Sequence, residues 1–536
     1  MTRSVIIAGV AGAAVIFAAG WFLGSKWNTR STTPRDPSPD RAESYSSSQP
    51  LEFSQRARHG QKLAVTVCGS CHLFPEPELL TKAEWTHEIL PSMAQWLGLR
   101  LVDYEGMKDG KMIQEARVFP TEPAIRMEDW LAIWDYYATA SPEKPLPQPA
   151  RPAGAGRSTL FRGRKLNFHA GLPAISLVQI DPAQQRLYVG DAYARLLAAL
   201  DPSGRVLSRT RVASPPVSLA MHQQGIYASL IGQLFPSDSA EGSVVRLSRT
   251  DTDASPETLL DQLRRPTDAK AADLNGDGRL DLVACSYGNR LGRFSWYETK
   301  ADGQFEEHVL IDRPGALRTE LHDFNRDGRM DIIVMTAQAR EGIYLFFNEG
   351  QGRFRAQTIV EQHPSFGYAA FQLVDFNRDG HLDLLTVNGD NGDYATPHKR
   401  YHGLRLLLND GAGQFRETWF YPLAGAYQAR AADFDLDGDL DIAAIAYYPD
   451  FSVPTVESFV YLENKGGTTF TPHSHADGDA GRWMVMDTGD LDGDGDTDLA
   501  LGSFLAGPTT IPVPAAMREH WRLNGAAVLV LENLRK

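Results

Sequence analysis

Cysteine is scarce in this sequence, and basic side chains are outnumbered. Only three cysteines occur among 536 residues, and Cys285 lies far from Cys68 and Cys71, so a disulfide framework is excluded. Lysine and arginine number 53 against 67 acidic residues, a net charge of −14, which makes nucleic acid a poor partner for the whole molecule. The sequence also has no glycine-rich phosphate loop and no spacing typical of a Ser/His/Asp or Cys/His nucleophile.

The first 52 residues are predicted to export and tether the chain. Residues 5–24 are uncharged, and about 20 apolar residues are enough to cross a bilayer. Residues 1–24 are therefore either a retained membrane anchor, which Lys26 behind the apolar run favours, or a signal peptide cleaved near Ala18 or Gly20. Residues 25–52 are rich in serine and proline and are expected to be a disordered tether. We expect an exported protein on the periplasmic or cell-surface side, anchored to the inner membrane.

Residues 68–72 read Cys-Gly-Ser-Cys-His, the C-x-x-C-H pattern of covalent haem attachment. Two thiols about one helical turn apart can each add to a vinyl group of the porphyrin, which directs the next histidine at the iron. A redox dithiol would need a surrounding βαβ pattern, and a zinc half-site would need a second ligand pair; the sequence supplies neither. We therefore predict one covalent haem c, held by Cys68 and Cys71, with His72 as the proximal ligand.

Two segments near this motif are predicted to be helices. These are residues 55–68 and residues 127–139, where aromatic and apolar side chains recur three and four positions apart. Residues 53–143 are therefore expected to form a small all-α, class I-like cytochrome c domain. A proline-rich linker at 144–159 marks a domain boundary.

The sequence leaves the sixth iron ligand open. We favour Met93, because Pro91 predicts a local turn and the flanking residues are apolar enough to keep water from the iron. A thioether ligand would give a higher potential than a second histidine. The alternatives are an open site or one of the remaining candidates, which are Met107, Met112, Met127, His59 and His87.

Five segments of nine residues then repeat one pattern. Positions 1, 3, 5 and 9 carry aspartate or asparagine, and position 6 is glycine. The residues at positions 1, 3, 5, 7 and 9 are Asp273, Asn275, Asp277, Arg279 and Asp281; Asp323, Asn325, Asp327, Arg329 and Asp331; Asp375, Asn377, Asp379, His381 and Asp383; Asp433, Asp435, Asp437, Asp439 and Asp441; and Asp490, Asp492, Asp494, Asp496 and Asp498.

This pattern predicts about five calcium sites. Side-chain oxygens at positions 1, 3, 5 and 9, with a backbone carbonyl at position 7, can surround a hard cation that needs six or more oxygens. An EF-hand would need a glutamate at position 12 and flanking helices, whereas position 12 here is Ala284, Val334, Thr386, Ala444 or Leu501. A β-rich run follows each loop, so the loops are expected to join strands. Mg²⁺ is disfavoured because it prefers a rigid octahedron that retains waters, and we expect the Ca²⁺ ions to be structural.

The spacing of the loops predicts a β-propeller. The first aspartates recur about every 54 residues, a period typical of propellers and repeat arrays. Residues 160–536 would therefore hold seven blades. Residues 175–201 and 217–230 are expected to belong to two blades that lack the loop, and residues 528–533 to supply a late strand of the last blade. Cyclic pairing of short sheets would protect their edges.

With both signatures, the chain resembles bacterial cytochrome c proteins fused to FG-GAP/VCBS-repeat β-propellers, and its loops are similar to integrin-type calcium loops. The resemblance covers everything after the tether. It implies haem c on Cys68, Cys71 and His72, and calcium in each aspartate loop. It implies architecture and location more firmly than a reaction.

One blade is lengthened by residues 388–403, which gather polar side chains. Two interpretations are open: a loop that carries binding or catalytic groups, and a polar insertion packed over a neighbour, which we favour. The residues concerned are Asp390, Asp393, Tyr394, His398, Arg400 and His402.

The leading functional hypothesis is an exported electron-transfer protein. Its haem domain would pass single electrons to or from a redox partner protein or a small donor, while the calcium-stabilised propeller would bind a partner or ligand. One alternative is an oxidoreductase whose substrate is oxidised on the propeller. Another is an adhesion or carbohydrate-binding protein in which the haem is a sensor.

Overall fold

The computed structural model describes residues 53–166, 171–249, 255–392, 399–453, 456–505 and 513–535. The predicted signal or anchor at 1–24, the tether at 25–52, and Asp393, Tyr394 and His398 lie outside these ranges. Within them, no helix is both long enough and apolar enough to cross a bilayer.

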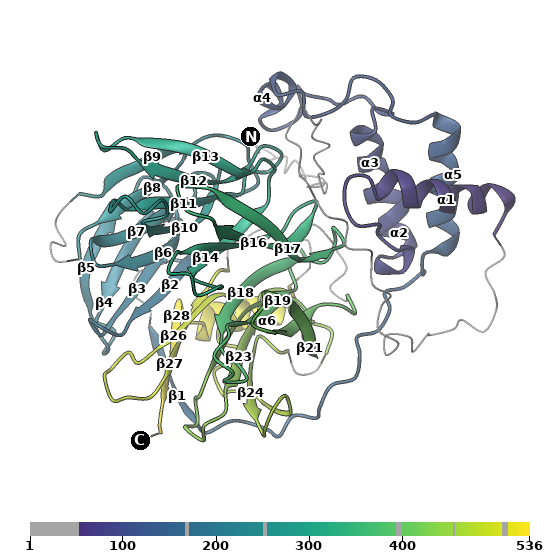
Figure 1. The fold of residues 1–536 in the computed structure, drawn as a ribbon. Helices are drawn as coiled ribbons and strands as arrows, with labels where there is room; N and C mark the ends of the chain where they lie inside the picture. Colours follow the sequence, from purple (N-terminus) through teal and green to yellow (C-terminus); the bar gives the residue numbers. More distant parts are fainter. Residues whose placement is uncertain are drawn as a thin grey trace, which may run out of the picture.

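A helical domain precedes the strands (Figure 1). Its α-helices are α1 (Gln55–Cys68), α2 (Lys82–Glu84), α3 (Leu90–Trp96), α4 (Gly110–Glu115) and α5 (Met127–Ala140), with a 3₁₀ turn at Pro77–Leu79 and a π-helical turn at Trp85–Ile89. The two helices predicted from the sequence, α1 and α5, are confirmed. They cross closely at Gly60, where a β-carbon would lie 1.8 Å from the carbonyl oxygen of Ala132.

Local sequence explains where these helices begin. The Ser54 hydroxyl accepts a hydrogen bond from the Ala57 amide at the start of α1. Thr81 and Glu84 form a reciprocal capping box at α2, which satisfies amides that lack a partner within the helix. Pro91 lies in the first turn of α3, where its missing N–H costs nothing.

The rest of the described chain forms seven four-stranded antiparallel sheets, so the predicted seven-bladed β-propeller is confirmed. Blades 1 to 4 consist of β2 (Ile175–Asp181), β3 (Arg186–Asp191), β4 (Leu196–Leu200) and β5 (Val206–Arg211); β6 (Pro216–His222), β7 (Gly225–Leu230), β8 (Gly242–Leu247) and β9 (Glu257–Leu263); β10 (Pro266–Ala272), β11 (Asp281–Ser286), β12 (Arg293–Thr299) and β13 (Phe305–Ile311); and β14 (Ala316–His322), β15 (Asp331–Thr336), β16 (Glu341–Asn348) and β17 (Phe354–Gln362).

Blades 5 to 7 complete the ring. They consist of β18 (Tyr368–Val374), β19 (Asp383–Asn388), β20 (Gly403–Asn409) and β21 (Phe415–Pro422); β22 (Ala426–Ala432), β23 (Asp441–Ala446), β24 (Phe459–Asn464) and β25 (Phe470–His473); and β26 (Trp483–Gly489), β27 (Asp498–Ser503), β28 (Val528–Asn533) and β1 (Phe161–Leu166). The strand β1 pairs antiparallel with β28, and Phe161 is opposite Asn533. The last blade thus takes strands from both ends of the propeller, which closes the ring; residues 528–533 belong to this blade as predicted, whereas the strand β1 was not predicted.

The core of the propeller lies between neighbouring blades. Every residue of the second strands β11, β15, β19, β23 and β27 is buried, because these strands are covered on both faces. The outer strand β5 instead alternates between half-buried and exposed residues. Cys285, in β11, is fully buried and packs as a small apolar side chain, and burial raises its thiol pKa well above the usual value.

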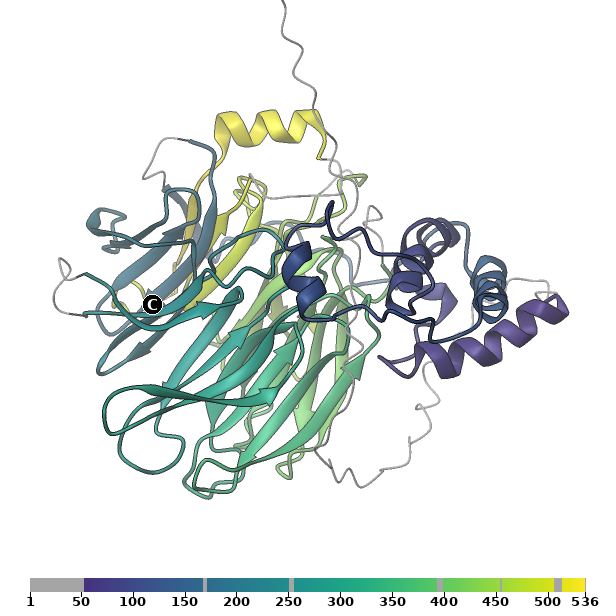
Figure 2. The same cartoon turned by 90° about the horizontal axis from the view of Figure 1, so that it is seen from above.

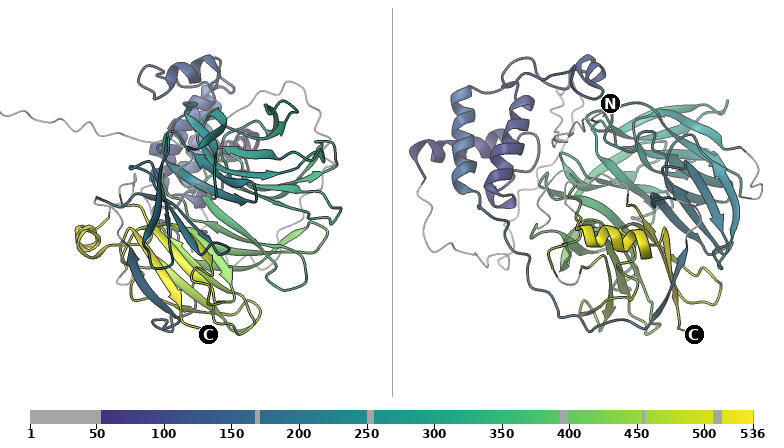
Figure 3. Two further views of the ribbon diagram at one scale, coloured as in Figure 1. Left: turned by 90° about the vertical axis from the view of Figure 1, so that its left-hand side faces the viewer. Right: turned by 180° about the vertical axis from the view of Figure 1, so that it is seen from behind.

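The two ends of the propeller carry different connections. The five aspartate loops join the first strand of a blade to the second, and we call this end the loop face. The connections from second to third strand lie at the opposite end, which we call the docking face. They include residues 389–402 and the segment that carries helix α6 (Ala515–Asn524). The helical domain lies at one side of the propeller, and α6 lies apart from it (Figures 2 and 3).

Candidate functional site

A mainly apolar pocket lies inside the helical domain, beside the C-x-x-C-H motif. It encloses about 750 Å³ free of protein atoms, counting its open side. Cys68, Cys71, His72 and Met93 all line it. Its other walls in this domain come from Val67, Pro75, Leu80, Trp85, Ile89, Leu90, Trp96, Leu97, Trp130 and Tyr137. The structure therefore brings together the four residues predicted to hold haem.

The end of α1 positions the attachment residues. Cys68 is the last residue of α1, and the Cys71 amide is 3.4 Å from the Cys68 carbonyl oxygen, so the two thiols lie one turn apart. His72 is buried, and its Nδ1 is 2.8 Å from the Leu73 carbonyl oxygen. A proton on Nδ1 donated to that carbonyl gives Nε2 the lone pair, the arrangement that metal-binding histidines use.

Burial sets the protonation of these groups. It lowers the pKa of His72 to about 4, so the ring is neutral, which is the form that binds iron. Burial also raises the pKa of Cys68 to about 11, so the thiol form is strongly favoured at neutral pH. Neither side chain carries charge into an apolar pocket, where charge would be costly.

Among the candidates for the sixth ligand, only Met93 lines this pocket. It comes from α3, directly after Pro91 and the π-helical turn. Met107 packs with Ile113 and Phe119 in a cluster that Met93 also joins, but Met107 is not in the pocket wall. His59 pairs with Asp129 at 3.4 Å on the surface. Met112 and His87 are not in the pocket wall, and Met127 is 51% exposed.

The pocket fits a flat apolar group with a polar edge. The Nε1 atom of Trp85 donates to Pro77, and the hydroxyl of Tyr137 donates to Pro75. Trp96 also lines the pocket and is 5% exposed, but its Nε1 has no hydrogen-bond partner among the described residues. A buried indole N–H without a partner costs free energy. A porphyrin, which carries carboxylate groups at its edge, would supply both the apolar surface and an acceptor.

The propeller contributes to this site as well. Pro364 and Ser365, between β17 and β18, line the pocket. Arg340, between β15 and β16, donates from Nε to the carbonyl oxygen of Cys71 at 2.8 Å. Sequence reasoning missed these three residues, and nothing in the local sequence signals them.

The described ends of the inserted segment 388–403 pack against neighbours. The Tyr401 hydroxyl approaches the Leu79 carbonyl oxygen of the helical domain at 3.5 Å. From the linker, Gln148 donates to the carbonyls of Lys399 and His402 at 3.2 and 3.3 Å. The described end of the insertion, residues 399–402, therefore packs against the linker and the helical domain, which favours the packed-insertion interpretation for these residues.

The five aspartate loops share one geometry. Position 1 accepts a hydrogen bond from the amide of the position 6 glycine, for example Asp273 from Gly278 at 2.8 Å. That glycine has a positive φ in all five loops, between 84° and 101°, a conformation that other residues rarely adopt. The position 9 aspartate is buried and accepts the amide of the last residue of the third strand, as Asp331 does from Asn348 at 2.7 Å.

The asparagines at these strand ends also connect blades. The side-chain amide of Asn348 donates to the Leu274 carbonyl of the preceding blade at 2.8 Å. Asn533 makes the equivalent bond to Phe434, also at 2.8 Å. The turns that follow these asparagines are visible in the sequence, but this bridging role is not.

The loops differ in how their carboxylates are compensated. In the loops of blades 3 and 4, the position 7 arginine pairs with the position 5 aspartate: Arg279 with Asp277, and Arg329 with Asp327. The loops of blades 6 and 7 have no such arginine. There, oxygens of the residues at positions 1, 3 and 5 lie within 4.8 Å of one another. These residues are Asp433, Asp435 and Asp437, and Asp490, Asp492 and Asp494.

Asp496 is the clearest sign of a missing partner at the loop face. It is 2% exposed, and neither carboxylate oxygen has a hydrogen-bond partner within the described ranges. Burial and then the neighbouring carboxylates raise its pKa to about 7. A bound cation would remove both penalties, so the loop of blade 7 fits a divalent ion.

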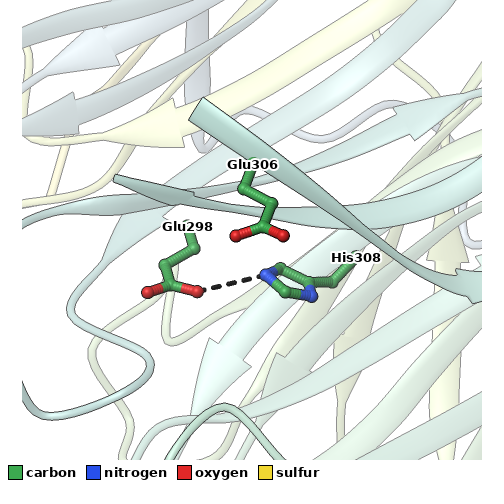
Figure 4. A group of neighbouring side chains, drawn as sticks. All are labelled: Glu298, Glu306 and His308. Carbon is green, nitrogen blue, oxygen red and sulfur yellow. Dashed lines mark hydrogen bonds and ion pairs between the residues drawn. The ribbon is translucent and has the colours of Figure 1, made fainter. Parts of the chain in front are cut away.

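A further acidic group on blade 3 has its own counter-ion. Glu298 Oε2 is 3.1 Å from His308 Nε2, and Glu306 lies beside them (Figure 4). The Lys300 ammonium is 2.9 Å from Glu298 and also pairs with Glu306. The lysine thus supplies the positive charge that a metal would otherwise bring.

Comparison with known proteins identifies the repeats. A family model described as "FG-GAP-like repeat" matches residues 273–334 and 323–386, so the chain carries FG-GAP-like repeats. A "T-cell immunomodulatory protein homolog" from Plasmodium falciparum is 33% identical over 85 residues. That match covers 14% of this chain and 12% of the relative's own length.

Two solved structures are among those that match this chain. Sqt1 of Saccharomyces cerevisiae matches 72% of this chain and 99% of its own, with 7% identity and a TM-score of 0.41. The β-propeller domain of Cps50 (Swd1) covers 69% of this chain and 99% of its own length, with 11% identity and a TM-score of 0.41.

Proposed function

We propose that this protein is an exported c-type cytochrome that transfers single electrons and uses its FG-GAP β-propeller as a binding scaffold. The observation that carries the proposal is the pocket in which Cys68, Cys71, His72 and Met93 converge. The proposed export and anchoring by residues 1–24 would place the protein where c-type haem is attached and where electrons pass between proteins.

Each residue has a defined task in this proposal. Cys68 and Cys71 would form the two thioether links, and neutral His72 and Met93 would hold the iron. The haem, when bound, supplies reversible one-electron chemistry. The apolar walls would exclude water, and Trp96, whose N–H has no partner among the described residues, could donate to a carboxylate of the haem.

We further propose that the aspartate loops bind Ca²⁺ and stabilise the propeller. The unpartnered carboxylate of Asp496 and the converging aspartates of blades 6 and 7 support this. The loops of blades 3 and 4 would bind more weakly, because Arg279 and Arg329 already neutralise one ligand each.

A second candidate function is oxidation of a substrate on the propeller. His402 favours it: the side chain is fully buried, and neither ring nitrogen has a hydrogen-bond partner among the described residues. It lies next to Tyr401, whose hydroxyl contacts the helical domain. Buried ionisable groups beside a cofactor pocket are typical of active sites.

The test begins with the protein exported through a c-type maturation pathway. We expect intact-mass analysis to show one added haem, and Cys68→Ala with Cys71→Ala to abolish covalent attachment. Met93→Ala should remove the red thioether-to-iron charge-transfer band, whereas the control Met107→Ala should keep it. Wild-type protein without haem would overturn the proposal.

An anaerobic donor screen then separates the two candidates. Reduction of the oxidised holoprotein only by redox proteins would support the carrier. Reduction by a small organic donor, lost in His402→Ala but kept in the surface control His59→Ala, would support substrate oxidation.

A further inference from the structure

The helical domain does not enclose its pocket alone. Pro364 and Ser365 of the propeller line the pocket together with Cys71 and His72. Arg340 donates to the Cys71 carbonyl, across 269 residues of sequence. Two separate connections of the docking face therefore meet the haem-attachment loop.

A second layer of side chains holds this wall in place. Ser365 is 6% exposed, and its hydroxyl lies 3.0 Å from His363 Nδ1 and 3.1 Å from the Tyr401 hydroxyl. The rings of Tyr401 and Phe366 are stacked with their planes 9° apart. The Tyr401 hydroxyl also approaches Leu79 of the helical domain. A hydrogen-bonded wall of this kind resists displacement, so a group in the pocket would meet a fixed surface.

Two cations belong to this wall, Arg340 and Arg405; Arg405 lies over the Phe366 ring and pairs with Glu417. Burial lowers the pKa of His363 to about 3, so that ring is neutral at pH 7. Burial raises the pKa of the Tyr401 phenol, which also stays neutral. The guanidinium of Arg340 donates to the carbonyl oxygen of Cys71, the residue before His72, so its positive charge lies beside the pocket wall. It would act on any charge that changes in the pocket.

We propose that the propeller forms part of the haem site: Pro364 and Ser365 close one side of the pocket, and Arg340 is a positioning residue that fixes the attachment loop and raises the reduction potential of the haem. This inference rests on the proposed function. Reduction adds one negative charge to the haem, and a nearby cation stabilises the reduced form more than the oxidised form. The propeller would thus tune electron transfer as well as bind a partner.

The effect of the Arg340 charge on the reduction potential is tested by redox titration of the full holoprotein. We expect Arg340→Gln to lower the equilibrium constant for one-electron reduction about threefold, or about 28 mV at 59 mV per tenfold. Arg340→Lys keeps the charge and should stay near the wild-type potential. Arg353→Gln removes an exposed arginine at the loop face of the same blade and should change nothing.

Two outcomes would overturn the role of Arg340. One is an unchanged potential in Arg340→Gln, and the other is an equal fall in Arg340→Lys and Arg340→Gln. A haem spectrum of the wild-type protein is recorded first. If it shows no haem, the proposed function fails, whereas a normal haem with an unresponsive potential rejects only this inference.

The role of Ser365 in the pocket wall is tested by introducing a larger side chain at this position. Ser365→Phe should lower haem occupancy or shift the Soret band, because the added ring enters the pocket, whereas Ser365→Ala should load haem fully. Ser203→Phe, in an exposed turn of blade 1, is the matched control. The thermal melt of the propeller confirms folding in each variant. Normal occupancy and an unshifted spectrum in folded Ser365→Phe would show that the propeller does not line the haem site.

Discussion

The loop face of the propeller repeats one carboxylate contact in five blades, whereas the contacts that join the docking face to the helical domain or its pocket are each made once. At the loop face, a buried position 9 aspartate accepts the amide that ends the third strand in every blade from 3 to 7. At the docking face, Arg340, Ser365 and Tyr401 each make a different contact with the helical domain or its pocket. The repeated contacts therefore stabilise the loop face, and single side chains join the helical domain at the docking face.

Chelation should give the largest loss of stability, because it removes ions from the aspartate loops of the loop face. Each ion contributes about 2.7 kcal/mol when its free concentration is 100 times its Kd, so removing several ions should lower the melting temperature of the propeller by roughly 10 °C or more. Calorimetry with and without EDTA measures this. Ca²⁺ should restore the transition and Mg²⁺ should not. A melting curve indifferent to EDTA would mean that the loops hold no ions.

A single position 9 carboxylate should stabilise the propeller even when no ion is bound. Asp331→Ala leaves the part-buried amide of Phe324 and the buried amide of Asn348 without an acceptor, which should cost about 3 kcal/mol in the free energy of unfolding. Urea denaturation of chelated protein measures the loss. Asp261→Ala, an exposed aspartate on β9, is the control and should have little effect. An equal loss of stability in both variants would contradict the role of Asp331 as the acceptor of these two amides.

At the docking face, Glu341 should make stability depend on pH. Its carboxylate accepts the amides of Gly367 and Tyr368 at 2.9 and 2.8 Å, and burial raises its pKa to about 8. Between pH 4.5 and 8 the unfolded chain loses this proton while the folded protein keeps it, so the contribution of Glu341 to stability falls as the pH rises. The loss should be on the order of 2 kcal/mol between pH 5 and pH 8.

Glu341→Gln tests this dependence, because an amide oxygen can accept the same two bonds without ionising. The variant should match the wild type near pH 5 and be more stable at pH 8. Glu349→Gln, an exposed glutamate at the other end of the same blade, is the control. If Glu341→Gln leaves the slope of stability against pH unchanged, burial does not perturb this carboxyl in the way described.

The same difference between the faces explains what the sequence could predict. The five loops, the seven blades and the convergence of Cys68, His72 and Met93 follow from motifs of a few residues and from their spacing. The cyclic arrangement of the blades was expected as well, but the pairing of β1 with β28 that closes the ring was not predicted. Arg340 and Ser365 could not be predicted, since they reach the C-x-x-C-H motif or its pocket only through the relative placement of two domains. Their local sequence differs little from that of other turns.

The presence or absence of a position 7 arginine should give the smallest effect, a difference in Ca²⁺ affinity between loops. Asp437→Asn removes a charge from the cluster it forms with Asp433 and Asp435, so Ca²⁺ affinity at that loop should fall about tenfold, or about 1.4 kcal/mol. Asp327→Asn alters a carboxylate already paired with Arg329 and should change affinity less than threefold. Calorimetric titration of chelated protein with Ca²⁺ should therefore show a tight site weakened only by Asp437→Asn. Equal losses would mean that arginine pairing does not set ion affinity, and the loops of blades 4 and 6 would then be equivalent despite their different side chains.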